Sequence, residues 1–208
     1  MPESSVEPEP SAAAELFGDR ITLARRFTAA LAAEGELRGL IGPLELPRLW
    51  TRHVLNSAIA ASLFHGSVAD VGSGAGLPGL VLAIARPDVE WTLIEPMERR
   101  VAWLTEQTES LGLDNVRIMR ARAEDVGLEF DVVTARAVSA LRTLIPITAP
   151  LAKDAGELIF LKGQNVDAEI AAAQKVLKKN KVSDVSVQVL GEGTLTETTR
   201  VFRARVRA

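Results

Sequence analysis

Apolar residues follow two different spacings along the chain, and the change falls near residue 67. Upstream of it they recur every three to four residues, which is typical of amphipathic helices. This pattern predicts helices over about 12–36 and 49–64, separated by a stretch punctuated by glycine and proline. Neither helix could bury its apolar face alone, so residues 13–66 are expected to form a helical extension packed on the rest of the chain. Residues 1–12 are acidic, rich in proline and poor in apolar side chains, and are predicted to be a disordered tail.

Downstream of this extension, short apolar runs alternate with helical stretches. The runs predict five strands, at 68–71, 91–94, 116–119, 130–134 and 158–161. The other stretches predict four helices, at 80–85, 99–111, 140–151 and 168–178. Alternation of this kind is typical of a parallel sheet with helices on both faces.

The end of the chain follows a different pattern. Two apolar runs, 182–190 and 198–208, flank a glycine turn at 191–193 and predict an antiparallel hairpin. The expected fold class is therefore α/β, with a doubly wound, Rossmann-like sheet over 67–208. That sheet should be mostly parallel and closed by the C-terminal hairpin. It should form a single folded unit with the helical extension.

Composition narrows the class of protein. A chain of 208 residues with 47% hydrophobic content fits one compact domain with a small appendage. It has no cysteine and only two histidines, His53 and His65, so we expect neither a disulfide nor a metal site. No apolar run approaches the roughly 18 residues of a membrane span, and the N-terminus lacks a signal pattern. We therefore expect a cytoplasmic monomer without a membrane partner.

The distribution of charge is more informative than the net charge of −3. The first 19 residues carry five acidic residues and no basic one, whereas the segment from Lys175 onward carries eight basic residues and three acidic ones. In the last strand Arg203, Arg205 and Arg207 share one face, which suits phosphate groups. The alternative, that these residues only form solvated faces, stays open.

The strongest local signal is the glycine-rich loop that follows the first strand, VADVGSGAGLPG at 68–79. It fits both the dinucleotide fingerprint GxGxxG and the DxGxGxG form of methyltransferases. Asp70 favours the second form, because a carboxylate beside a pyrophosphate is unfavourable, whereas S-adenosylmethionine carries positive charge and no phosphate. We therefore predict that Gly72, Gly74 and Gly76 contact S-adenosylmethionine.

Two further acidic residues lie where a nucleoside would need them. Glu95 ends the second strand, 19 residues after Gly76, close to the offset at which an acid reaches ribose hydroxyls in nucleotide-binding α/β folds. Glu124 follows the third strand, where it could accept from an adenine amino group while the backbone of Ala123 meets the ring. A plain helix cap is the alternative for Glu124.

Five segments together resemble the RsmG (GidB) family of ribosomal RNA methyltransferases. They are RHVLNS at 52–57, DVGSGAGLPG at 70–79, TARA at 134–137, LKGQ at 161–164 and ETTR at 197–200. The resemblance covers nearly the whole chain from about Arg20. One departure is Asn56, where the family usually has Asp, which puts a charged role at this position in doubt.

The resemblance implies a class I methyltransferase that modifies guanine N7 in small-subunit 16S rRNA, at guanine 527 of the 530 loop. Its partner would be 16S rRNA or the small subunit, and its product S-adenosylhomocysteine. The family's pattern implies cofactor contacts at Gly72, Leu77, Glu95, Ala123, Glu124 and Arg136. It implies RNA or target-base contacts at Arg52, His53, Lys162 and Arg200, to which the stripe adds Arg203.

Guanine N7 has a lone pair and no proton, so its methylation needs no general base. Arg136 and Lys162 are accordingly expected to position the reacting groups, and Trp50 is a candidate to stack on a base. From the residues alone, Arg136 and Lys162 could equally be ion-pair partners, and His53 a core histidine. The alternative functions are methylation of another RNA or a small molecule, NAD(P)-dependent oxidoreduction, and RNA binding without catalysis.

Overall fold

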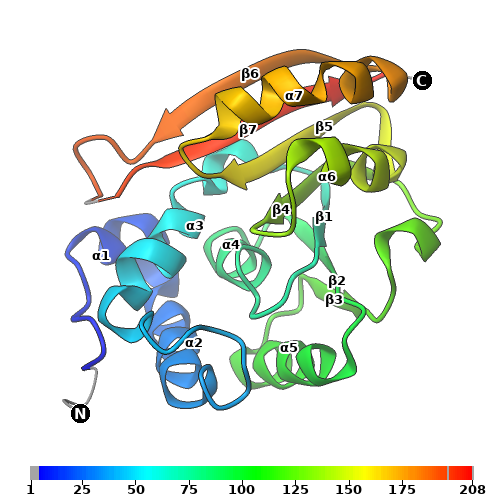
Figure 1. The fold of residues 1–208 in the computed structure, drawn as a ribbon. Helices are drawn as coiled ribbons and strands as arrows, with labels where there is room; N and C mark the ends of the chain where they lie inside the picture. The colour runs from blue at the N-terminus through cyan, green and yellow to red at the C-terminus, as the bar shows by residue number, and fades with distance from the viewer. Residues whose placement is uncertain (1–4, 196, 208) are drawn as a thin grey trace.

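The computed structural model describes residues 5–195 and 197–207. Within them, seven strands form one sheet in the order β3-β2-β1-β4-β5-β7-β6 (Figure 1). The strands are β1 (Ser67–Val71), β2 (Glu90–Ile94), β3 (Val116–Met119), β4 (Phe130–Arg136), β5 (Ala152–Lys162), β6 (Val182–Leu190) and β7 (Thr199–Val206). Strands β1 to β5 pair in parallel, and β7 runs antiparallel to both β5 and β6. The predicted mostly parallel sheet with a C-terminal antiparallel hairpin is confirmed.

Helices cover both faces of the sheet, and each face has its own hydrophobic cluster. The four helices between strands are α4 (Gly79–Ala85), α5 (Glu98–Leu111), α6 (Leu141–Thr148) and α7 (Val166–Lys179). In β1, Val68 belongs to the cluster that contains α4 and α5, whereas Val71 belongs to the cluster of α6 and α7. Alternate residues of a strand face opposite sides, so each strand contributes to both clusters.

The N-terminal extension packs on the face that carries α4 and α5 (Figure 1). It consists of α1 (Ala12–Phe17), α2 (Ile21–Glu34), a π-helix η3 (Leu49–Leu55) and α3 (Asn56–Ala58). Short 3-10 turns lie at η1 (Gly18–Arg20), η2 (Leu46–Arg48), η4 (Ala61–Leu63), η5 (Ala123–Asp125) and η6 (Ala149–Leu151). None of the helices in the described part of the chain is long and apolar enough to cross a membrane.

Several predicted boundaries are wrong, for local reasons. The helix predicted over 12–36 is broken at Gly18, whose φ of 49° lies in the left-handed region that ends helices. The helix predicted over 49–64 begins as a π-helix, whose hydrogen bonds span one more residue than those of the α-helix that was assumed. The helix predicted over 140–151 ends at Thr148, because Pro150 cannot donate the hydrogen bond that would continue it.

The predicted disordered tail differs from the structure at two acidic residues. The backbone N–H of Glu7 donates to the carbonyl of Leu46 at 2.9 Å, and its carboxylate accepts from the N–H and the hydroxyl of Thr51. Glu9 forms an ion pair with Arg25 at 2.6 Å. Residues 1–4 of the predicted tail lie outside the described residues. Glu7 and Glu9 therefore tie the described part of the tail to the helical extension.

Candidate functional site

The glycine loop follows β1, at the point where the strand order reverses between β1 and β4. Ligands of doubly wound sheets bind outside the carboxyl ends of the strands at such a point. Gly72, Gly74 and Gly76 all have positive φ, at 72°, 55° and 91°. A Cβ on Gly76 would lie 2.5 Å from Leu80, whereas a Cβ on Gly74 would lie no closer than 3.7 Å to its neighbours. The space beside Gly74 is therefore open, whereas any side chain at Gly76 would clash with Leu80.

The side chain of Asp70 lies at the start of α4. It is fully buried, and its Oδ2 accepts from the backbone N–H of Gly79 at 3.1 Å. A Cβ on Gly79 would lie 2.4 Å from that same oxygen, so only glycine fits there. Burial raises the pKa of Asp70 to about 7. The carboxyl group thus holds the first residue of α4, a role that was not predicted from the sequence.

Glu95 lies against the glycine loop, as its predicted role requires. It is 2% exposed, and its two oxygens accept from the backbone N–H groups of Gly74 at 3.0 Å and Met97 at 2.9 Å. The end of β1, the end of β2 and Ala123 share one hydrophobic cluster. Glu124 follows Ala123 in η5 and is exposed. Leu77, later in the loop, is half-buried. The predicted cofactor residues other than Arg136 are thus brought together at the ends of neighbouring strands.

A cavity of about 770 Å³ lies at the carboxyl ends of β4 and β5. Four segments line it: η3 with α3, the turn after β4, the turn after β5, and the start of β7. The side chains that bear on its chemistry are Arg52, Asn56, Arg136, Lys162, Glu169, Glu197 and Arg200. Four of the five segments that carry the family resemblance contribute residues to this cavity, and the glycine loop is the exception.

Val138 connects the cavity to the glycine loop. It lies in the turn after β4, lines the cavity and is 41% exposed. A Cβ on Gly72 would meet its side chain at 2.9 Å. The preceding Ala137 has a φ of 54°, which is unfavourable for a residue with a side chain. The sequence reasoning did not single out Val138, because a lone valine after a strand carries no pattern.

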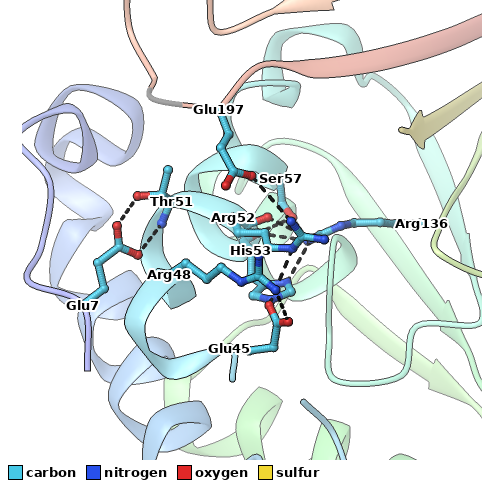
Figure 2. A network of polar contacts seen from close by, with 9 residues as sticks. All are labelled: Glu7, Glu45, Arg48, Thr51, Arg52, His53, Ser57, Arg136 and Glu197. Atoms are coloured by element: carbon cyan, nitrogen blue, oxygen red, sulfur yellow. Dashed lines mark hydrogen bonds and ion pairs between the residues drawn. The ribbon is translucent and has the colours of Figure 1, made fainter. Parts of the chain in front are cut away.

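Arg136 is committed mainly to the helical extension (Figure 2). Its Nη1 donates to the carbonyl of His53 at 3.1 Å and to the hydroxyl of Ser57 at 3.0 Å. Its Nη2 donates to the carbonyl of Arg52 and to Nδ1 of His53, both at 2.9 Å. A guanidinium has five N–H groups, so only Nε–H is left for a cofactor or RNA. Burial lowers the pKa of Arg136 to about 10. That value is still well above 7, so the guanidinium is charged at neutral pH.

His53 and Trp50 are not free to contact RNA in this structure. Both ring nitrogens of His53 are engaged, by Arg136 and by Glu45 at 2.6 Å from Nε2. Trp50 is 5% exposed, so the stacking role suggested for it is wrong. Arg52, by contrast, keeps 44% of its side chain exposed and lies 3.8 Å from Glu197. The alternative of a buried histidine with its partners satisfied describes His53 best.

Lys162 and Arg200 lie side by side at the cavity, in register between β5 and β7. The Lys162 ammonium donates to the carbonyl of Ser139 at 3.0 Å and pairs with Glu169 at 2.7 Å, with only 10% of its side chain exposed. Its charge is therefore largely neutralised within the protein. Arg200 is half-buried and lines the cavity.

Arg203 does not lie with Arg200. The two residues differ by three positions in a regular strand, so they project from opposite faces of β7. Arg203 pairs with Glu157 at 2.7 Å, and Arg207 lies 3.6 Å from Asp184. Arg200 and the arginine stripe therefore lie on opposite faces of β7.

Asn56 lines the cavity, and its Oδ1 is buried with no hydrogen-bond partner in the described part of the chain.

Glu45 and Glu7, which hold η3, were missed by the sequence reasoning. They are single acidic residues in irregular segments, where no periodicity marks them. Among the described residues, no group of three or more His, Cys, Asp or Glu side chains could hold a metal ion.

Known proteins resemble the chain over nearly its whole length. The family model described as GidB, rRNA small subunit methyltransferase G, matches residues 20–198. A protein of Leifsonia xyli named ribosomal RNA small subunit methyltransferase G is 66% identical over 98% of this chain and 99% of its own length. The protein of the same name from Clavibacter michiganensis is 60% identical over 99% of this chain and 100% of its own.

Solved structures share the fold at low sequence identity. The N-methyltransferase NodS from Bradyrhizobium japonicum, solved with S-adenosyl-L-homocysteine, has a TM-score of 0.58 and 15% identity, covering 85% of this chain and 99% of its own. A SAM-dependent O-methyltransferase from Thermotoga maritima has a TM-score of 0.56 and 17% identity, covering 74% and 65%. The fold is that of class I methyltransferases, and an oxidoreductase is no longer a viable alternative. The chain belongs to the GidB family, rRNA small subunit methyltransferase G.

Proposed function

We propose that this protein transfers a methyl group from S-adenosylmethionine to N7 of a guanine in 16S rRNA, at guanine 527 of the 530 loop. The observation that carries the proposal is the close approach of Val138 to Gly72, where an added Cβ would lie 2.9 Å from the valine side chain. This approach joins the glycine loop to a cavity lined by Arg52 and Arg200. A cofactor loop and a basic cavity that meet at one side chain suit transfer between a nucleoside cofactor and a nucleic acid.

The residues present fit S-adenosylmethionine. The open space at Gly74 and the carboxylate of Glu95 beside it form a cradle that a Cβ would fill. The residues that would hold the cofactor are Gly72, Gly74, Gly76, Leu77, Glu95, Ala123 and Glu124. When bound, the cofactor supplies an electrophilic methyl group and leaves as S-adenosylhomocysteine. Arg136 contributes at most its Nε–H, because its other four N–H groups bind the extension.

The protein's part in the chemistry is to position the base. Guanine N7 attacks with its lone pair and loses no proton, so no general base is required. Holding the base in line with the methyl group contributes several kcal/mol, on the order of the effects measured for oriented reactants. A cation aimed at N7 would block the attack, so Arg52 and Arg200 are proposed to contact O6 or phosphate. The ion pair with Glu169 keeps the Lys162 ammonium from competing with the methyl group for guanine N7.

The target base must lie in a loop or be extruded from its helix to reach the cavity, because side chains cannot enter the deep major groove of A-form RNA. Arg52 and Arg200 are proposed to hold the flanking phosphates. We further propose that the protein acts as a monomer in the cytoplasm, where its substrate is the small subunit or free 16S rRNA.

The proposal is tested by methyl transfer from labelled S-adenosylmethionine to small subunits from cells that lack this enzyme, followed by mapping of the modified base. We expect label at N7 of guanine 527, and none on subunits that already carry the modification. Label at another base, or on the protein fraction alone, would refute the assignment of the target.

A further inference from the structure

The hydrogen bonds of His53 select one tautomer of its ring (Figure 2). Nδ1 lies 2.9 Å from Nη2 of Arg136, and Nε2 lies 2.6 Å from Oε2 of Glu45. A guanidinium can only donate hydrogen bonds, so Nδ1 must be the acceptor. Nε2 then carries the proton, which it donates to the Glu45 carboxylate. The ring is thus a neutral bridge between the end of β4 and the segment before η2.

Glu45 is shared by three side chains. Besides His53, its carboxylate accepts from Nη2 of Arg48 at 2.7 Å and lies 3.6 Å from Nε of Arg52. Burial raises the pKa of Glu45, but hydrogen bonds from Arg48 and His53 outweigh burial and leave the pKa below its ordinary value. Glu45 is therefore a carboxylate, and it offsets the repulsion between the Arg52 and Arg136 charges.

The same side chains fix η3 to the sheet. Arg136 binds the carbonyls of Arg52 and His53, which belong to the last turn of the π-helix. Arg136 and Arg52 also line the cavity. The Arg52 guanidinium thus lies between two carboxylates, Glu45 at its Nε and Glu197 at 3.8 Å from its Nη1, and Arg136 holds the backbone of Arg52.

We propose that Glu45 and His53 are positioning residues for RNA binding, which hold the Arg52 guanidinium at the cavity without touching RNA. The proposal rests on the proposed function, because it takes this cavity as the place where RNA binds. His53 suits the task because it must donate on one side and accept on the other. Burial, reinforced by the Arg136 charge, lowers the pKa of His53 below 6.5 and keeps the ring neutral at pH 7.

Glutamine can replace both hydrogen bonds of a neutral histidine, since its amide offers an N–H donor and a carbonyl acceptor. The test compares His53→Ala, His53→Gln and Glu45→Ala by the KM for unmodified small subunits, kcat, and calorimetric affinity for S-adenosylhomocysteine. For the two alanine variants we expect KM to rise about tenfold, the usual effect of losing one hydrogen bond to a charged group. We expect kcat and cofactor affinity to stay near the wild-type values, and His53→Gln to restore most of the KM.

A matched control is Glu34→Ala, which removes the ion pair of Glu34 with Arg38 in the same extension, outside the cavity. Its KM should not change. If His53→Gln is as impaired as His53→Ala while both bind S-adenosylhomocysteine normally, His53 contacts RNA itself and the proposal is overturned. An unchanged KM in Glu45→Ala would likewise overturn the role of Glu45.

A second measurement does not depend on the substrate. The chain has only two histidines, so their ring nitrogens can be assigned by NMR. We expect the Nε2–H tautomer at His53 in the wild-type protein and also in Glu45→Ala, because the Arg136 guanidinium donates to Nδ1 in both. His65, with 60% of its side chain exposed, serves as the internal reference. A mixture of tautomers at wild-type His53 would overturn the proposal, whereas failure of wild-type methyl transfer would refute the proposed function alone.

Discussion

The backbone N–H of Gly74 donates to Oε2 of Glu95 at 3.0 Å, which ties the glycine loop after β1 to the end of β2. These two residues are 21 positions apart in the chain. Their contact brings the carboxylate proposed for the ribose directly to the loop proposed for the rest of the cofactor.

The first prediction concerns Glu95. Glu95→Ala should weaken binding of S-adenosylhomocysteine by about 1–3 kcal/mol, the cost of losing a hydrogen bond to a charged group. Isothermal titration calorimetry measures this directly. Glu98→Ala is the control, because Glu98 follows closely in the chain but is 78% exposed and pairs only with Arg120 among the described side chains. Equal affinities for the Glu95 variant and the wild type would refute the ribose assignment.

The second prediction concerns the space at Gly74. Gly74→Val should abolish cofactor binding while the protein stays folded, because the branched side chain enters the open space beside the loop. Gly112→Val is a matched control. Gly112 has a similar φ of 63° at the end of α5, and a Cβ there would meet nothing within 4 Å. Both variants should lose a similar amount of stability, about 1 kcal/mol for a left-handed residue, but only Gly74→Val should lose cofactor affinity. Normal affinity in Gly74→Val would show that the loop does not touch the cofactor.

The third prediction concerns Asp70 and pH. Burial raises its pKa from 3.8 to about 7, so the folded protein holds a proton that the unfolded chain has lost. The stabilising contribution of this group is fully present below pH 3.8 and is lost as the pH rises through about 7. Asn at this position can still accept from the backbone N–H of Gly79, and it carries no charge to bury. Asp70→Asn should therefore gain stability relative to the wild type between pH 5 and pH 8, measured by urea unfolding. A difference between the two proteins that does not change with pH would contradict the raised pKa.

The fourth prediction separates the two faces of β7. Arg200→Gln should weaken binding of small-subunit RNA and lower its salt slope by roughly 0.7, the value for one phosphate contact on a single strand. Replacing Arg203, Arg205 and Arg207 together by Gln should lower the salt slope by less than the value for three phosphate contacts. The reason is that Arg203 and Arg207 already have carboxylate partners. Filter binding at several salt concentrations tests both variants. An unchanged slope for the triple variant would show that the stripe is a solvated face.

Much of the fold could be predicted because it depends on local patterns. The parallel strands alternate with helices, and the turn residues Gly72 to Gly76 mark the end of the first strand. The opposite orientations of Arg200 and Arg203 could also have been predicted, since they follow from the two-residue period of a strand. The position of η3 as a π-helix could not, because a π-turn differs from an α-turn by one residue and leaves no distinct apolar period.

The order of elements, the glycine loop and the motifs that mark the family are local features, and they can be predicted from the chain alone. Which polar groups are free to act depends on the folded arrangement. Arg136 binds Arg52 and His53 from more than 80 positions away, and Lys162 is neutralised by Glu169. Such pairings depend on which elements the fold brings within hydrogen-bond distance, and no local pattern encodes that distance. A basic residue in a motif therefore identifies a candidate, and the folded chain decides whether its charge reaches the substrate or is held within the protein.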